Sequence, residues 1–285
     1  MGSGLHEWPL MLFTVLGQCV AGGLIVMGLG WLSDDDNNQR TRILRSMFFL
    51  WVIMGLAFLA SVIHLGSPLR AFNSLNRVGH SALSNEIASG SLFFAVGGFW
   101  WLVAILGKMP QALGKLWLAL AMVLGIIMVW MMARVYNGID TVPTWHTGYT
   151  ALGFFMTLLL GGPLLGVMLL RAARVNLASG KLAVISVLAL LVTVAAVVMQ
   201  GSELPQIHSS VIQADALVPD YALLQVVRLA LLALGLGCWL CPLLRHREPR
   251  FAGLLIGFVL VVAGELIGRG IFYGLHMTVG MAIAG

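Results

Sequence analysis

Charged side chains are scarce in this chain: 9% of its 285 residues are Asp, Glu, Lys or Arg, whereas 60% are hydrophobic. Soluble domains carry about 25% charged residues, so the composition excludes an ordinary soluble fold. The mean hydropathy of +0.97 agrees with this reading. The net charge of +5 comes mainly from arginines that flank apolar runs, which is typical of membrane topology and not of a nucleic-acid-binding surface.

Cysteine is also scarce, and the three present all lie in apolar runs: Cys19, Cys238 and Cys241. An odd, sparse set favours neither a disulfide framework nor an iron–sulfur cluster, which needs four thiolates. The C-x-x-C spacing of the last two is therefore interpreted as two small apolar helix residues. The N-terminal segment lacks the basic region and cleavage site of a signal peptide, so the first apolar run is expected to be a retained span.

Long apolar runs are abundant. A helix needs about 20 residues to cross a bilayer, and eight runs qualify, at roughly 9–33, 43–66, 85–107, 114–136, 150–171, 182–200, 222–244 and 251–275. None alternates with a period of two, which excludes the strands of a membrane barrel. The sequence predicts an all-α membrane protein, a bundle of eight helices forming a single transmembrane domain over residues 1–285.

The basic residues predict the orientation of this bundle. Eleven of the sixteen Lys and Arg residues fall in the odd-numbered connections: Arg40, Arg42, Arg45, Lys108, Lys115, Arg171, Arg174, Lys181, Arg245, Arg247 and Arg250. The positive-inside rule assigns these connections to the cytoplasm. Both termini then lie on the periplasmic side, together with Arg70 and Arg77, which depart from the rule.

The histidines gather on the predicted outer side, with six of the seven there: His6, His64, His80, His146, His208 and His276. Haems that carry electrons across a membrane need axial histidines at two depths. Because His246 alone lies on the inner side, the sequence argues against such haems, and we expect no haem or metal in this protein.

The segment from residue 63 to 86 is unusually polar for a connection between two spans. His64 and Glu86 flank it at the same predicted depth, and each also suits a helix end: His64 precedes Gly66 and Pro68, and Ser84 or Asn85 could cap the next helix. Arg70, Asn73, Ser74 and Arg77 share helical spacing, which predicts a short amphipathic helix in the interface. Its arginines would face lipid phosphates or an acidic partner.

The last apolar run carries four polar residues on one helix face, Glu265, Arg269, Tyr273 and His276. Charged groups within a span are costly unless they are paired or hydrated. Two interpretations remain open and are compatible: a structural ion pair, and a polar track for protons toward the outer surface.

An outer cluster of this kind suits the oxidation of a lipid-soluble quinol, which needs hydrogen-bond partners and groups that accept protons near neutrality. His64 and Glu86 are the candidate acceptors. The electrons must leave through a partner, because this protein offers no ligand set for a redox cofactor.

Several long motifs carry a resemblance to a known family: "HEWPL" (6–10), "LGQCVAGG" (16–23), "HLGSPLRAFNSLNR" (64–77), "LSNEIASGSLFFAVGG" (83–98), "IDTVPTW" (139–145), "IHSSV" (207–211), "ALVPDY" (216–221) and "GELIGRGIFYGLHMTVGMA" (264–282). Through them the protein resembles the membrane-anchor subunit (DmsC type) of anaerobic dimethyl sulfoxide reductase and its close bacterial paralogues, including the selenate-reducing variant.

The resemblance implies a multi-pass protein of the bacterial inner membrane that works in anaerobic respiration. It implies eight spans with outer termini, no haem, menaquinol as substrate, and an iron–sulfur subunit that feeds a molybdopterin catalytic subunit on the periplasmic side. The family's quinol-site histidine corresponds to His64 and its essential glutamate to Glu86. Ser67, Arg70 and Arg77 are candidates for shaping the site or docking the partner, and His80 has no assigned role.

Two alternatives remain: an ion-coupled transporter or channel that uses the polar track, and a structural tether without quinol chemistry. Under the favoured reading the protein is the quinol-oxidising subunit of an oxidoreductase complex and does not itself catalyse reduction of the terminal acceptor. The sequence does not determine that acceptor.

Overall fold

A computed structural model describes residues 2–64, 73, 75–175, 179–208 and 213–277. Within these ranges, eight helices are long and apolar enough to span a membrane. They are α2 (Trp8–Ser33), α3 (Asn37–His64), α5 (Ala82–Ile105), α6 (Gln111–Asn137), α7 (Gly148–Ala172), α8 (Gly180–Glu203), α9 (Tyr221–Leu244) and α10 (Phe251–Gly274). The expected all-helical, eight-span architecture is confirmed.

Shorter elements lie between these helices. They are the four-residue helix α1 (Gly2–Leu5) and the 3-10 helices η2 (Leu75–Arg77), η3 (Leu204–Gln206) and η4 (Ala214–Leu217). Among the long helices, α3 differs most from its expected range: it begins at Asn37 instead of near residue 43. Its polar first turn has no apolar signal, and this explains the difference.

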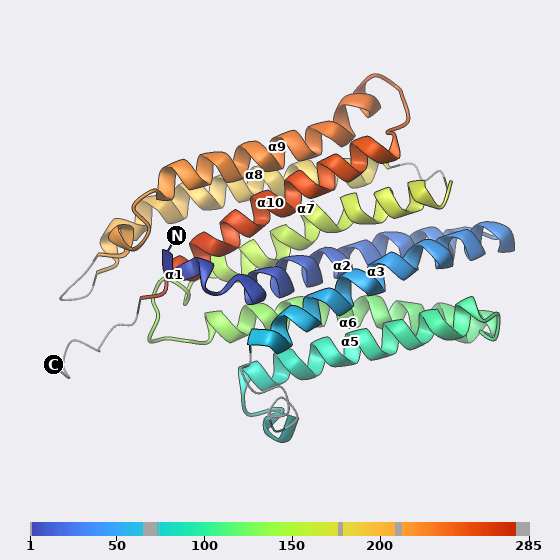
Figure 1. Cartoon of the computed structure of the whole chain (residues 1–285), viewed down its shortest axis with the longest axis horizontal. Helices are drawn as coiled ribbons and strands as arrows, with labels where there is room; N and C mark the ends of the chain where they lie inside the picture. Colours follow the sequence, from blue (N-terminus) through green and yellow to red (C-terminus); the bar gives the residue numbers. More distant parts are fainter. Residues whose placement is uncertain (1, 65–72, 74, 176–178, 209–212, 278–285) are drawn as a thin grey trace.

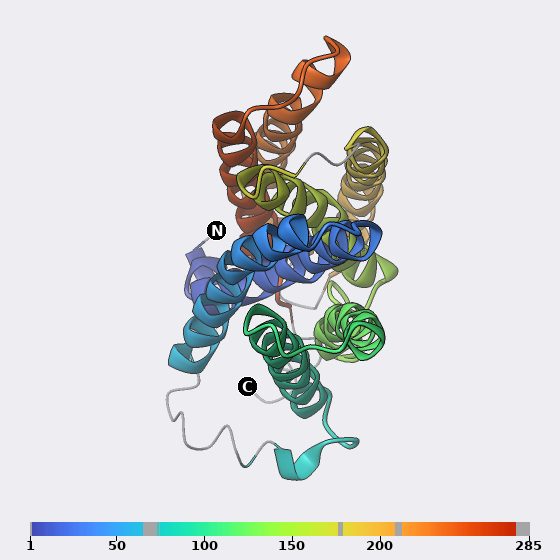
Figure 2. The same ribbon diagram turned by 90° about the vertical axis from the view of Figure 1, so that its right-hand side faces the viewer.

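The helices run antiparallel in chain order and form two groups (Figures 1 and 2). One group contains α2, α3, α5 and α6, and the other contains α7 to α10. The groups meet along α2 and α7, which are the most buried spans, with 78% and 72% of their apolar windows covered by protein. These two helices therefore form the centre of the bundle, and the others present large apolar faces outward to lipid.

Glycine allows α2 and α7 to approach closely. A Cβ atom added to Gly162 would lie 2.5 Å from the Cα atom of Gly22, and one added to Gly22 would lie 2.6 Å from the carbonyl oxygen of Leu158. Small residues at such crossings let membrane helices pack backbone to backbone. The spacing of the two groups is thus set by these two glycines.

We call the end of the bundle that holds α1 the α1 end, and the opposite end the far end (Figure 1). The last turns of α3, α6, α8 and α10 and the first turns of α2, α5, α7 and α9 lie at the α1 end. The predicted quinol-site residues and the polar residues of the last span therefore share one end, as the alternating topology requires.

The start of α5 corrects one prediction. The N-cap is Ser81, whose Oγ accepts a hydrogen bond from the backbone N of Ser84 at 3.5 Å; the sequence had favoured Ser84 or Asn85. Asn85 instead accepts a 2.6 Å hydrogen bond from the backbone N of Gly79. Its side chain closes the turn before the helix, so Glu86 lies inside the second turn and not at the helix end.

The predicted amphipathic helix falls mainly outside the described residues. Its described C-terminal part is the 3-10 helix η2, not an α-helix. His80 and Ser81 donate backbone hydrogen bonds to the Arg77 carbonyl oxygen and close the following turn. Arg77 and Val78 are both exposed there.

Candidate functional site

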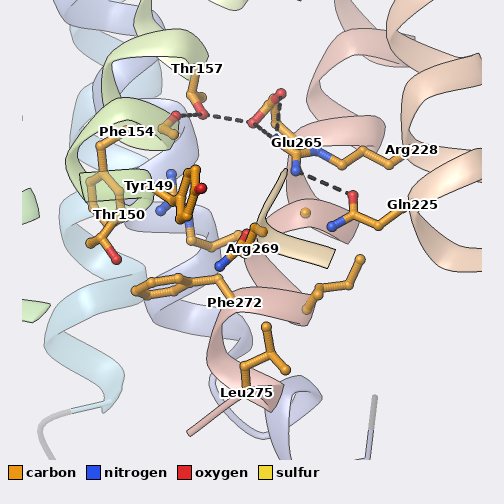
Figure 3. A pocket seen from close by; sticks show the side chains of 14 residues that line it. Tyr149, Thr150, Phe154, Thr157, Gln225, Arg228, Glu265, Arg269, Phe272 and Leu275 are labelled. Atoms are coloured by element: carbon orange, nitrogen blue, oxygen red, sulfur yellow. Dashed lines mark hydrogen bonds and ion pairs between the residues drawn. The ribbon is translucent and has the colours of Figure 1, made fainter. Parts of the chain in front are cut away.

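The centre of the α1 end contains charged side chains that are almost completely buried. Glu265 and Arg269 of α10 retain 2% and 5% exposure, although both lie in an apolar span. Glu265 is nine residues before the end of α10, or about 14 Å along the helix axis at 1.5 Å per residue. Charges at this depth require partners, and the surrounding helices supply them (Figure 3).

Glu265 is held by side chains from two neighbouring helices. Nη2 of Arg228, from α9, lies 3.3 Å from its Oε2 and 3.4 Å from its Oε1. The hydroxyl of Thr157, from α7, donates to Oε2 at 2.6 Å. The expected pairing of Glu265 with Arg269 is wrong, because the ion pair joins α9 to α10 and is not formed within α10.

Arg269 is stabilised differently. Its Nη2 donates to the Oε1 atom of Gln18, on α2, at 3.1 Å, and its guanidinium carbon lies 3.7 Å from the centre of the Phe154 ring. Its Nε is buried without a hydrogen-bond partner among the described residues. A cation over an aromatic face gains favourable electrostatic energy, so the ring partly replaces the missing carboxylate.

Two tyrosines connect this network to Glu86. The hydroxyls of Tyr136 and Tyr273 lie 2.8 Å apart in a buried hydrogen bond. Both hydroxyls are within electrostatic range of Glu86 and of Arg269. The structure thus brings together two sets that the sequence had treated separately, the predicted quinol-site carboxylate and the predicted polar track.

Glu86 itself is 6% exposed. No described residue donates a side-chain hydrogen bond to its carboxylate, in contrast to the donors that surround Glu265. A buried carboxylate without donors is unfavourable as an anion, and it is therefore suited to accept a proton.

A small polar pocket opens beside the buried ion pair, between α7, α9 and α10 (Figure 3). Its cavity volume is about 60 Å³, enough for several water molecules, since one needs about 10–15 Å³ on the same measure. It is lined by Tyr149, Thr150, Gly153, Phe154, Thr157, Gln200, Gln225, Arg228, Glu265, Gly268, Arg269, Ile271, Phe272 and Leu275. Hydration of the charged groups from this side lowers the cost of their burial.

The remaining predicted site residues have different positions. His64 is the last residue of α3, and Ser67 and Arg70 lie outside the described residues. Arg77 and His80 are exposed in the turn before α5. His276 follows the end of α10, where its exposed ring packs 4.7 Å from Trp145, so the predicted face within the helix ends at Tyr273.

The described residues offer no group of three His, Cys, Asp or Glu side chains that could hold a metal ion. The expectation that the protein binds no haem or metal stays a prediction.

The sequence analysis missed the contributions of Gln18, Thr157 and Gln225, and it placed Arg228 only at a span end. One signal was available, because Gln225 and Arg228 are three residues apart in an apolar run, and the Nη1 atom of Arg228 lies 3.5 Å from the Gln225 Oε1. The single polar residues of α2 and α7 gave no comparable signal.

Comparisons with known proteins agree with the motifs described above. The family model for the DMSO reductase anchor subunit (DmsC) matches residues 1–275. The protein is 66% identical to YnfH of the Escherichia coli anaerobic dimethyl sulfoxide reductases and 61% identical to the C subunit of that organism's anaerobic dimethyl sulfoxide reductase. It is 42% identical to the C subunit of the Haemophilus influenzae enzyme, and every match covers 100% of both proteins.

The eight spans and these full-length relatives identify a multi-pass protein of the inner membrane. The protein belongs to the DMSO reductase anchor subunit (DmsC) family.

Proposed function

We propose that this protein anchors a reductase complex in the membrane and oxidises menaquinol for it. The relatives are named as subunits of anaerobic dimethyl sulfoxide reductase, so the partners would be an iron–sulfur subunit and a molybdopterin catalytic subunit. Dimethyl sulfoxide, selenate or a related acceptor would be reduced in the latter. The anchor would supply the electrons.

The observation that carries this proposal is the buried carboxylate of Glu86. It lies in the second turn of α5, at the end of the bundle where α3 finishes at His64. A quinol that enters from the lipid needs acceptors for two protons at this depth. Glu86 is suited to take one of them because no described donor competes for its oxygens, and His64 is the candidate for the other.

Two electrons leave the quinol as its two hydroxyl protons are released. The electrons would pass to the docked iron–sulfur subunit, and the product quinone would return to the lipid. Arg77, exposed beside the site, and Arg70 and Ser67 would contribute to docking or to the shape of the site. The Tyr136 and Tyr273 hydroxyls would keep the region around Glu86 polar within an apolar bundle.

The proposed orientation puts the α1 end on the periplasmic side. Protons and electrons would then leave from the same side, so quinol oxidation by this subunit would not itself generate a membrane potential. Proton release on the cytoplasmic side would contradict this orientation.

A substitution of Glu86 tests the site. In the assembled complex, Glu86→Gln should reduce menaquinol-dependent acceptor reduction by about 100-fold, which is within the usual contribution of a proton acceptor. A soluble dye that reduces the iron–sulfur subunit directly should still drive the reaction at the wild-type rate.

Asp140→Asn provides the matched control, because Asp140 is an exposed carboxylate at the same end of the bundle. It should leave both activities unchanged. Wild-type menaquinol activity in Glu86→Gln would refute the site, and binding of a quinol analogue to the wild-type complex would exclude a purely structural tether.

The transporter alternative receives less support. Of the four buried charged residues described, Glu86, Glu265 and Arg269 lie toward the α1 end, and Arg40 lies at the far end. A transport path would require further polar groups between them. The described interior is instead dominated there by side chains such as Leu24, Met27 and Leu165.

A further inference from the structure

A second hollow lies at the far end of the bundle, away from the site described above. It forms between the first turns of α3 and the end of α7 and has a volume of about 340 Å³. Its lining consists of Arg42, Arg45, Ser46, Phe49, Ala172, Ala173 and Arg174. Three arginines therefore surround a single depression at the edge of the membrane-spanning region.

These three arginines have no acidic partner among the described residues. Neighbouring arginines at this end do: Arg40 lies 3.8 Å from Asp35 and Arg171 lies 3.3 Å from Glu248. The hollow thus concentrates positive charge that the protein does not neutralise. Arginine is well matched to phosphate, because its planar guanidinium can donate two parallel hydrogen bonds.

The lining changes from polar to apolar along α3. Arg42, Arg45 and Phe49 follow at steps of three and four, so they share one helix face over about 10 Å of rise. The Phe49 side chain is 55% exposed and lies on the bilayer side of the arginines. A ligand that fits this gradient has a negative headgroup next to an acyl chain.

The floor of the hollow is fixed. The hydroxyl of Ser46 is buried and donates a 2.6 Å hydrogen bond to the Leu169 carbonyl oxygen, which holds α3 against α7. The arginines on both helices are thereby kept at a constant separation, and the site does not have to assemble when a ligand arrives.

Arg174 occupies a strained position at the end of α7. Its φ of 56° is in the left-handed region, where glycine is usual and other residues cost about 1–2 kcal/mol. A side chain retained at such a position suggests a use for it. The general preference for basic residues on the cytoplasmic side explains the sign of the charge but not why three arginines, one of them strained, share one hollow with an exposed aromatic ring.

We propose that this hollow binds an anionic phospholipid, with the phosphate held by Arg42, Arg45 and Arg174 and an acyl chain lying over Phe49. Basic pockets between spans on the cytoplasmic side are suited to such headgroups. The lipid would bridge α3 and α7, and thus the two groups of helices, at the end opposite the quinol site.

The test uses the full complex, delipidated in a neutral detergent. Native mass spectrometry would measure retained phosphatidylglycerol, and thermal unfolding would measure the stabilisation by added phosphatidylglycerol, phosphatidylcholine or inorganic phosphate. Each arginine should contribute about fivefold to affinity. Arg174→Gly should therefore weaken phosphatidylglycerol binding about fivefold, and R42Q/R45Q by roughly 25-fold.

Arg174→Gly also separates binding from folding. It relieves the left-handed strain, so its melting temperature without lipid should equal or exceed that of the wild type, although it binds lipid less well. His246→Gly is the matched control, because His246 has a φ of 52° after α9 and does not line the hollow. It should bind phosphatidylglycerol as the wild type does.

Equal lipid retention by Arg174→Gly and His246→Gly would overturn the proposal, as would equal stabilisation by phosphatidylcholine. Inorganic phosphate that stabilises the complex as strongly at the same concentration would identify a free-phosphate site and overturn the lipid assignment.

Discussion

At the scale of single residues, cost identified the important side chains but not their partners. Glu265 and Arg269 stood out in the sequence because charges inside a span are rarely tolerated without a reason. Their spacing of four suggested that they neutralise each other. The structure pairs Glu265 with Arg228 and Arg269 with Gln18, because the facing sides of α9 and α2 bring these groups closer than the shared face of α10 does.

The ion pair between Arg228 and Glu265 leads to a stability prediction. Arg228→Met should lower the free energy of unfolding by about 3–5 kcal/mol, because it leaves a buried carboxylate without its cation. The double variant R228M/E265Q removes both charges and should lose less than the sum of the two single changes. A double-mutant cycle by denaturant unfolding of the purified protein measures this coupling.

Additive losses in that cycle would contradict a direct interaction. The exposed ion pair between Arg171 and Glu248 offers a comparison, because Glu248 retains 64% side-chain exposure. Pairs exposed to solvent typically contribute about 0–1 kcal/mol, so R171M/E248Q should show little coupling.

At the scale of elements, apolar runs located every span, whereas the helix ends depended on local polar chemistry. Hydropathy does not register the polar first turn of α3, and three candidate caps before α5 are chemically similar. Ser81 is the cap because Asn85 is already bonded to the backbone of Gly79. This contact depends on the turn geometry, and the sequence of the helix alone does not contain it.

The glycine contact between α2 and α7 provides an element-scale prediction. Gly162→Ala should destabilise the protein by about 1–3 kcal/mol, because its Cβ would lie 2.5 Å from the Cα of Gly22 and would force the helices apart. Gly98→Ala is the control, since a Cβ there meets no atom within 4 Å. It should be neutral or stabilising by up to about 1 kcal/mol, through helix propensity.

Thermal unfolding of the two variants in the same detergent checks this expectation. If Gly162→Ala unfolds at the same temperature as Gly98→Ala, the close approach of α2 and α7 does not limit packing.

At the scale of the whole molecule, two groups of four helices are joined by apolar packing and by a polar network at one end. Gln18 of α2 bonds to Arg269 of α10, and Tyr136 of α6 bonds to Tyr273 of α10. The buried groups beside Glu86 therefore depend on both halves of the protein. A change in how the groups pack should alter the proposed quinol site even if no site residue is changed.

The proposed orientation is a whole-molecule prediction that labelling can check. In a variant whose three native cysteines are replaced by serine or alanine, Asp215→Cys at the α1 end should react with an impermeant maleimide in spheroplasts. Arg247→Cys at the far end should react only in inverted vesicles. Both positions are exposed, and the reverse pattern would contradict periplasmic termini.

The sequence by itself determined the class of protein, the number of spans and the end of the bundle at which the polar residues gather. Hydrophobic length and alternating topology fix these features without knowledge of which helices touch. Tertiary structure decided which helices are central, which cation pairs with Glu265, and that Glu86 and the last span share one tyrosine pair. The physical reason is that lipid and protein interior are equally apolar, so hydropathy marks a span but not the side of it that faces its neighbours.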